Sequence, residues 1–246
     1  MAIRVYLKED SSTKKKVIIS LSHLSLTLGI LLLFWSFYPV ISFEIYSRFI
    51  IKNKFIAPIS SSTMASSLQQ AGSILSSYDV FSNNLRDFTQ ARLWFPNKQQ
   101  TGQIRQFAIR EYYLTIPKLN IFKARVLIGG EDLSKGLIHY LPTSLPGEYG
   151  NVAIFGHSTL PQLFNVKDYK TIFTYLPSIE KGNSITVDIG DLKYDYEVFE
   201  MFVVKPDQVS VLEQKYDASY LTLITCVPPG TYWQRLVVKA KLTKFP

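Results

Sequence analysis

Cysteine and histidine are scarce in this 246-residue sequence, which has one cysteine, Cys226, and three histidines, His23, His139 and His157. A single cysteine excludes an internal disulfide framework and any zinc or redox site built on a Cys-x-x-Cys pair. Three histidines spread along the chain form no obvious ligand cluster, so we expect no metal and no cofactor. The lone thiol must therefore be either a small core side chain or a reactive group.

Charged side chains are missing from residues 17–43, a stretch rich in Leu, Ile, Phe and Trp. The stretch exceeds the about 20 residues that a helix needs to cross a bilayer, so we predict one transmembrane helix. We interpret it as an uncleaved signal anchor, because it is longer than the apolar region of an ordinary signal peptide and no small-x-small cleavage site follows it. The three lysines that end residues 1–16 favour a cytoplasmic tail, whereas Arg48, Lys52 and Lys54 weaken that bias.

The net charge of +8 is confined to the N-terminal part of the chain. Residues 1–16 carry five basic and two acidic side chains, and residues 44–110 carry eight basic and three acidic ones. Residues 111–246 contain equal numbers of each sign. This distribution favours contact with an anionic membrane surface and gives no reason to expect a nucleic-acid partner.

Residues 44–107 change character, because short runs of serine interrupt a weak apolar pattern. The spacing of Leu68, Ala71, Ile74 and Leu75 fits one or two helical turns. We predict a juxtamembrane stalk or linker with some helix, which serves either as a plain spacer or in binding.

Residues 108–246 read as a mainly β domain. Short alternating apolar stretches are separated by turn signals such as Pro146-Gly147 and Gly190-Asp191. A short helix or 3₁₀ turn is expected only at residues 168–176 and 207–213. Many short strands favour a closed or nearly closed β-barrel, because closure removes exposed strand edges. The expected strands are residues 112–116, 121–128, 151–155, 185–189, 194–204, 220–225 and 235–243.

The lone cysteine ends one of these expected strands. The apolar run 220–225 leads to Cys226, and Pro228-Pro229-Gly230 must break the strand because proline cannot donate to a ladder. Alternation resumes at Arg235, which opens the next strand. We therefore expect Cys226 and Arg235 to face the same rim of a hairpin.

A second segment delivers a histidine in the same manner. The turn at residues 146–151 feeds an apolar strand that ends at Gly156-His157. A thiol, an imidazole and a guanidinium at strand ends make a plausible nucleophilic site, with a thiolate nucleophile, a proton-transfer group and an oxyanion donor. Taken singly, each residue has a plainer interpretation as a core cysteine, a turn histidine or a solvated arginine.

These residues resemble the sortases, the membrane-anchored cysteine transpeptidases of bacterial surfaces. The resemblance covers residues 113–242, and its specific parts are Thr222-Leu-Ile-Thr-Cys226, the downstream Arg235 and the upstream Gly156-His157. Further matching parts are Leu114-Thr-Ile-Pro117, Gly136-Leu-Ile-His-Tyr140 and Pro146-Gly-Glu148.

The resemblance implies an eight-stranded β-barrel with Cys226 as nucleophile, His157 as general acid/base and Arg235 as oxyanion or substrate-positioning group. It implies cleavage of a C-terminal sorting signal of the Leu-Pro-x-Thr-Gly type through a thioacyl-enzyme. The partners would be surface proteins that bear the signal and an amine acceptor, either a peptidoglycan precursor or a pilin. The N-terminal helix would anchor the protein in the bacterial cell membrane with the barrel outside.

Four further residues are candidates for substrate binding: Thr225, His139, Tyr232 and Trp233. Thr225 is expected to orient the thiol or contact substrate, and His139 either to contact substrate or to pack a turn. The aromatic side chains of Tyr232 and Trp233 are expected to line one wall of a peptide groove.

The sequence also departs from parts of the family. It has no Asp-Pro-Trp or Asp-Pro-Phe string of a lid, and the tryptophan motif of the stalk is Trp94-Phe-Pro96. The acidic residues near Glu200 show no calcium-binding motif. The same residues would serve a cysteine peptidase or acyl hydrolase, and a catalytically vestigial, membrane-tethered β-barrel binding module is a further alternative. An L,D-transpeptidase is disfavoured, because the chain lacks a Ser-His-Gly-Cys-like string.

Overall fold

The computed structural model of the chain describes residues 13–49, 90–95 and 109–244. The chain divides into two compact units, Met1–Ser42 and Phe43–Pro246. The expected helix at residues 68–75 lies outside the described residues.

Helix α1 extends over Thr13–Phe49, and its Lys15–Ile45 portion is long and apolar enough to cross a membrane. Its 31 residues would span about 46 Å at 1.5 Å per residue, more than the about 30 Å hydrocarbon core of a bilayer. The large apolar side chains of residues 17–38 are all exposed in this unit. An apolar exterior of this kind is typical of a segment that is solvated by lipid.

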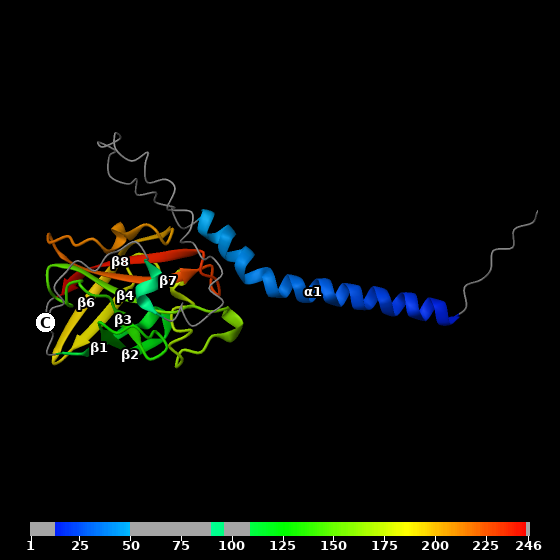
Figure 1. The fold of residues 1–246 in the computed structure, drawn as a ribbon, viewed down its shortest axis with the longest axis horizontal. Coiled ribbons are helices and arrows are strands. Elements are labelled where there is room, and N and C mark those ends of the chain that lie inside the picture. Colours follow the sequence, from blue (N-terminus) through cyan, green and yellow to red (C-terminus); the bar gives the residue numbers. More distant parts are fainter. Residues whose placement is uncertain (1–12, 50–89, 96–108, 245–246) are drawn as a thin grey trace, which may run out of the picture. The chain divides into compact units, whose positions relative to one another are not determined.

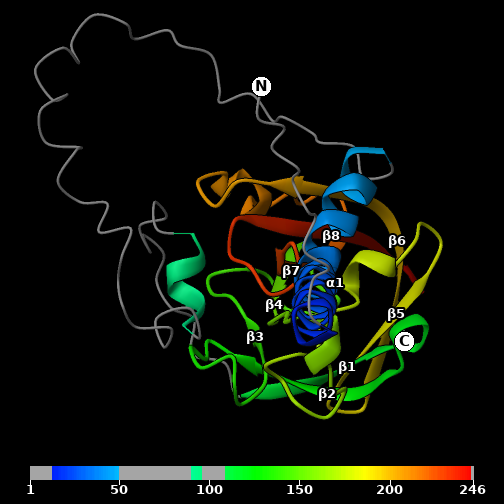
Figure 2. The same ribbon diagram turned by 90° about the vertical axis from the view of Figure 1, so that its right-hand side faces the viewer.

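Eight strands in the described part of the chain close into a barrel with the order β1-β2-β3-β4-β7-β8-β6-β5 (Figures 1 and 2). Neighbouring strands are antiparallel except for the pairs β2·β3 and β4·β7, which are parallel. Pairing of β1 with β5 closes the ring. The strands are β1 Glu111–Ile116, β2 Ile121–Ile128, β3 Leu137–His139, β4 Gly150–Phe155, β5 Ser184–Ile189, β6 Leu192–Val204, β7 Ser219–Val227 and β8 Gln234–Lys244.

The eight-stranded, mainly β fold expected from the sequence is confirmed. The pattern missed β3, because three residues are too few to display an alternation. Of the two expected helical segments, residues 168–176 form turns, followed by the 3₁₀ helix η6, Leu176–Ser178. Residues 209–212 form another, η7, Val209–Leu212. The remaining short 3₁₀ helices are η3 Ala91–Trp94, η4 Pro117–Leu119 and η5 Pro161–Leu163.

Strand β7 is buried on both faces, and Cys226 lies on its outer face. Leu221 and Leu223 belong to a large cluster with contributions from all eight strands, which fills the barrel interior. Ile224 and Cys226 belong to a second cluster on the opposite, outer face of β4, β7, β8 and β6. We call this second set the outer cluster; its buried members include Ala91, Trp94, Phe95, Leu133, Ile138, Tyr140, Ala153, Phe155, Phe202, Val204, Val211, Leu212, Ile224, Cys226 and Val237.

Candidate active site

Cys226 and Arg235 lie directly opposite each other on the antiparallel strands β7 and β8. Directly opposed residues of an antiparallel pair project from the same face of the sheet, so the thiol and the guanidinium are neighbours. Arg235 Nη1 donates a hydrogen bond to the carbonyl oxygen of Tyr232 at 3.0 Å, which ties the guanidinium to the β7–β8 loop. Cys226 and Arg235 are each only 3% exposed.

His157 follows β4 and lies level with Cys226. The parallel pairing of β4 and β7 ends at Phe155 and Ile224, and the same offset, carried two residues further, would place His157 level with Cys226. Three hydrogen bonds hold the chain on either side of His157 against β7. They are Gly156 N to Ile224 O (3.1 Å), Thr225 Oγ1 to Gly156 O (2.8 Å) and Ser158 Oγ to Cys226 O (2.6 Å).

Gly156 is needed here for reasons of space. A Cβ atom at this position would lie 2.4 Å from a ring carbon of Phe173 and 2.6 Å from a methyl carbon of Leu137. Real Cβ atoms essentially never approach so closely, so a larger residue would push β4 away from its neighbours. The glycine therefore allows the close packing that brings His157 to β7.

Burial shifts the pKa values of Cys226 and His157 in the directions that favour their neutral forms. It raises the pKa of the Cys226 thiol to about 11, although the Arg235 charge acts in the opposite direction. It lowers the pKa of His157 to about 4, against a smaller upward effect of the Asp132 carboxylate. In this buried arrangement the resting site holds a thiol and a neutral imidazole.

The Trp94 ring lies near both the histidine and the arginine. Its ring centroid is 5.8 Å from that of His157, and the Arg235 guanidinium carbon lies 5.3 Å from the Trp94 ring, within cation–π range. Arg235 Nη2 also donates to the Trp94 carbonyl oxygen at 3.4 Å, and the indole stacks on Phe155 at 5.5 Å. Residues of the expected stalk thus pack onto the candidate site.

Two buried nitrogens of the site lack a hydrogen-bond partner among the described residues. They are Nε2 of His157 and Nε of Arg235. An unpaired buried polar atom is costly and calls for an explanation, such as a role in binding or catalysis. Both atoms belong to residues that the sequence singled out.

The other predicted residues have different surroundings. Thr225 is fully buried and fixes the Gly156 backbone, whereas Tyr232 and Trp233 are exposed on the β7–β8 loop. His139 is fully buried, with Nδ1 2.9 Å from the Tyr112 hydroxyl and Nε2 3.1 Å from that of Thr143. These contacts describe a residue that packs β3 against its turn, and they do not join His139 to Cys226.

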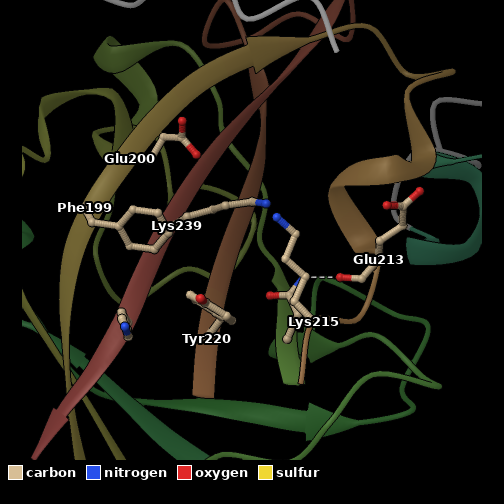
Figure 3. Close-up of a pocket in the computed structure, with 8 residues that line it drawn as sticks. Phe199, Glu200, Glu213, Lys215, Tyr220 and Lys239 are labelled. Carbon is tan, nitrogen blue, oxygen red and sulfur yellow. Dashed lines mark hydrogen bonds between the residues drawn. The ribbon is translucent and has the colours of Figure 1, made fainter. Parts of the chain in front are cut away.

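A separate cavity of about 390 Å³ lies at the far end of the same outer face (Figure 3). It is lined by residues of β4, β6, β7 and β8, including Tyr220 and Lys239, and by Lys215. Tyr220 precedes Cys226 by six residues on β7, a distance of about 20 Å along a strand. Cys226, His157 and Arg235 do not line this cavity, so it is not the candidate active site.

Sequence reasoning did not assign a contact to Trp94, Ser158 or Asp132. A tryptophan followed by phenylalanine in an otherwise serine-rich, polar stretch was the available signal for Trp94. Ser158 donates a hydrogen bond to the backbone oxygen of Cys226, and the charge of Asp132 acts on the pKa of His157. Only the folded chain reveals these two relationships.

Comparisons with known proteins show the family of the chain. The family model of the sortase domain matches residues 114–243. Sortase D of Bacillus subtilis is 27% identical over 133 residues, which cover 53% of this chain and 58% of that protein. Sortase SrtE1 of Streptomyces coelicolor is 27% identical over 194 residues, which cover 68% and 52%.

A solved structure is similar as well. The pilus-related sortase C of group B Streptococcus is 26% identical, with a TM-score of 0.50 and coverage of 65% of this chain and 84% of that one. The chain spans between half and three fifths of the length of the two curated relatives. Because the family model matches more than half of the sequence, the chain belongs to the sortase family.

Proposed function

We propose that this protein is a membrane-anchored cysteine transpeptidase that cleaves a Leu-Pro-x-Thr-Gly-type sorting signal and transfers the acyl part to an amine. The observation that carries the proposal is the convergence of Cys226, His157 and Arg235 at one end of the outer face. Membership of the sortase family supports it.

The first step forms a thioacyl-enzyme on Cys226. The thiolate sulfur attacks the carbonyl carbon of the scissile peptide bond, and the oxygen gains negative charge in a tetrahedral intermediate. Arg235, opposite Cys226 on β8, donates hydrogen bonds to that oxygen. When the C–N bond breaks, the imidazolium of His157 gives a proton to the leaving nitrogen, so a neutral amine departs, His157 becomes neutral and the acyl part stays on Cys226 as a thioester.

The second step regenerates the free enzyme. The acceptor amine attacks the thioester carbon, His157 removes a proton from the attacking nitrogen, and the C–S bond breaks to release the Cys226 sulfur. Water in place of the amine would give hydrolysis through the same acyl-enzyme, so a cysteine peptidase shares the first step. The fate of the thioester therefore distinguishes the two activities.

The reactive form requires a change from the resting one. A thiol with a pKa of about 11 and an imidazole with a pKa of about 4 are both neutral at pH 7. Attack needs a thiolate, and proton donation needs an imidazolium. Because burial causes both shifts, greater solvation or a new hydrogen-bond partner would move the pair towards the charged forms.

The partners follow from the anchor and the family. Helix α1 would hold residues 44–107 and the barrel domain of residues 108–246 at the outer membrane surface, with residues 1–16 in the cytoplasm. The substrates would be surface proteins with a sorting signal, and the acceptor a peptidoglycan precursor or a pilin. The solved relative from group B Streptococcus is described as pilus-related, which supports keeping the pilin among the acceptors to be tested.

Product analysis tests this proposal. The full chain in detergent micelles would be incubated with a library of Leu-Pro-x-Thr-Gly peptides and an amine, either triglycine or a lysine-containing pilin peptide. We expect a ligated product that requires both Cys226 and the amine. Cleavage to the free acid alone, at equal rates with and without any amine, would identify a hydrolase instead.

A further inference from the structure

The cavity at the far end of the outer face, which we call the lysine cavity, lies on the same sheet surface as the candidate active site (Figure 3). Because side chains alternate along a strand, Lys239 and Lys241 share a face of β8 with Arg235. By the same rule, Tyr220 shares a face of β7 with Cys226. Polar and charged side chains therefore replace the apolar ones of the outer cluster at this end of the strands.

A β-bulge in β6 builds an aromatic wall of the lysine cavity. Residues 198 and 200 of β6 pair with consecutive residues of β8, so Phe199 between them is an extra residue in the ladder. A bulge of this kind re-aims a side chain. The Phe199 ring centroid lies 6.0 Å from that of Tyr220 on β7. Phe199 is 41% exposed, so the wall offers apolar surface that a ligand can cover.

The rim that the β6–β7 loop forms is held in place by hydrogen bonds. The Gln214 side-chain amide accepts from the backbone N–H of Asn151 and donates to its carbonyl oxygen, each at 2.9 Å. The Asn151 side chain in turn donates to the carbonyl oxygens of Val211 and Glu213, at 3.2 and 3.4 Å. These bonds fix the loop segment that carries Lys215, so the rim is organised before any ligand arrives.

Lysine side chains converge on the lysine cavity from two elements. Figure 3 shows Lys215, from the β6–β7 loop, and Lys239, from β8, with their amino ends pointing toward one another. Three lysines and two glutamates line the cavity, which gives it a net positive charge. Lys239 faces Glu200 across the β6–β8 ladder, whereas Lys215 forms no ion pair within the described part of the chain. Like charges that converge repel each other, and an anion bound between them would be attracted to both.

The size and chemistry of the lysine cavity narrow the class of anion. Ammonium groups act as point charges that suit the several oxygens of a phosphate, whereas a planar carboxylate is matched better by the fork of an arginine. The volume of about 390 Å³ is in the range of sites for small organic ligands and exceeds what an inorganic ion fills. The aromatic wall of Phe199 and Tyr220 can cover the carbon atoms of an attached group. These features together indicate a phosphate joined to a small organic group.

We propose that the lysine cavity is a binding site for a phosphate ester, whose phosphate oxygens contact the amino groups of Lys215 and Lys239. The organic group of the ester lies against Phe199 and Tyr220. Two sources at a membrane surface share this chemistry: the phosphodiester headgroup of a lipid and a soluble phosphate monoester. Tyr220 precedes Cys226 by six residues, about 20 Å along β7, so binding does not require the thiol. Ligand binding in this cavity is therefore independent of the proposed function.

Equilibrium binding tests the site directly. The full chain in micelles of an uncharged detergent is titrated by isothermal titration calorimetry with two esters. They are glycerol 1-phosphate, a monoester, and glycerophosphoglycerol, the deacylated diester headgroup of a lipid. We expect saturable binding of at least one ester and no binding of glycerol. Tighter binding of the diester identifies a lipid headgroup as the source, and tighter binding of the monoester identifies a soluble phosphate.

Lysine substitutions locate the phosphate. Lys215→Gln and Lys239→Gln each remove one charge-assisted contact, so we expect the Kd of the ester to rise by about tenfold or more in each variant. The matched control is Lys118→Gln, which removes the same charge from a lysine of η4 that pairs with Glu180 and does not line the cavity. The Kd of this control should stay within about twofold of the wild-type value.

Phe199→Ala separates the two parts of the ligand. The substitution removes the apolar wall and leaves the lysines in place. We therefore expect the Kd of the ester to rise by about fivefold and the Kd of inorganic phosphate to stay unchanged. An equal loss of affinity for both anions would contradict the position given to the organic group.

The outcomes also separate this site from the proposed function. Thermal melting establishes that the compared proteins are folded. An absence of saturable binding by folded wild-type protein would overturn the site, as would an equal rise in Kd for Lys118→Gln and the cavity variants. If Lys239→Gln does not fold, Lys215→Gln decides alone, because Lys215 is exposed. Cys226→Ala should bind the ester as tightly as the wild type, so a failure to cleave any peptide would contradict the proposed function and leave the binding result standing.

Discussion

The side chains of Cys226 and Arg235 project from the same face of the β7–β8 ladder, directly across from each other. In the mechanism proposed above, the guanidinium stabilises the oxyanion that forms when the sulfur attacks. Arg235→Lys keeps the charge and loses the planar fork of donors, so we expect kcat/KM to fall by about 10²- to 10³-fold.

Peptide cleavage rates measure this effect. Arg125→Lys is the matched control, because Arg125 is an exposed β2 residue that donates to the Lys135 carbonyl oxygen, away from the outer cluster. We expect its kcat/KM to equal that of the wild type. An Arg235→Lys enzyme with wild-type kcat/KM would show that the opposed geometry is not used in catalysis.

Thr225 should act by positioning. Its hydroxyl donates to the Gly156 carbonyl oxygen, next to His157. Thr225→Val leaves that oxygen without this donor, so we expect a loss of about 1–3 kcal/mol in unfolding free energy together with a lower kcat.

Thr222→Val separates stability from positioning. Thr222 is also buried on β7, and its hydroxyl donates to Asn151 Oδ1 at 2.6 Å, remote from His157. We expect a comparable loss of stability, measured by urea unfolding, with kcat per folded molecule unchanged. Equal losses of kcat in the two valine variants would contradict a specific role for Thr225.

Acid should destabilise the protein through its buried histidines. Burial lowers the pKa of both His139 and His157 from 6.5 to about 4. Between these values the unfolded chain binds more protons than the folded one, so stability is full above pH 6.5 and falls as the pH drops towards 4. Each histidine contributes up to about 3 kcal/mol to this loss.

Urea unfolding at pH 7.0, 5.5 and 4.5 measures how the unfolding free energy depends on pH. The glutamine in the His157→Gln variant cannot titrate. The difference in unfolding free energy between wild type and variant should therefore shrink steadily as the pH falls. A parallel pH dependence in the two proteins would mean that His157 is not buried in its neutral form.

The membrane orientation is also testable. With residues 1–16 in the cytoplasm and the barrel outside, protease added to intact cells should digest residues 108–246, while inverted membrane vesicles should protect them. An epitope at each end of the chain reports the fragments on a blot. Protection of the barrel in intact cells would reverse the proposed topology.

The β7–β8 hairpin could be anticipated from the sequence, because local residue chemistry specifies it. The Pro228-Pro229-Gly230 break forces β7 to end close to Cys226, and resumed alternation places Arg235 on the return strand. The position of His157 required more, since β4 and β7 are far apart in the sequence and their parallel register is set by packing. The family resemblance supplied that link.

The position of residues 90–95 could not be anticipated from periodicity. Six residues with a single short 3₁₀ helix carry no repeating pattern, and Phe155 and Arg235, which Trp94 contacts, lie 61 and 141 positions downstream. Strand β7 is buried on both faces. The outer cluster covers its outer face, and residues of the 90–95 segment and of η7 contribute to that cluster.

The proposed function is tested most directly by the mass of the enzyme itself after exposure to a Leu-Pro-x-Thr-Gly peptide without an amine. We expect a covalent acyl adduct that maps to Cys226, is absent from Cys226→Ala, and disappears when an acceptor amine is added. Folded wild-type protein that forms no adduct with any peptide of the library would contradict the proposed function.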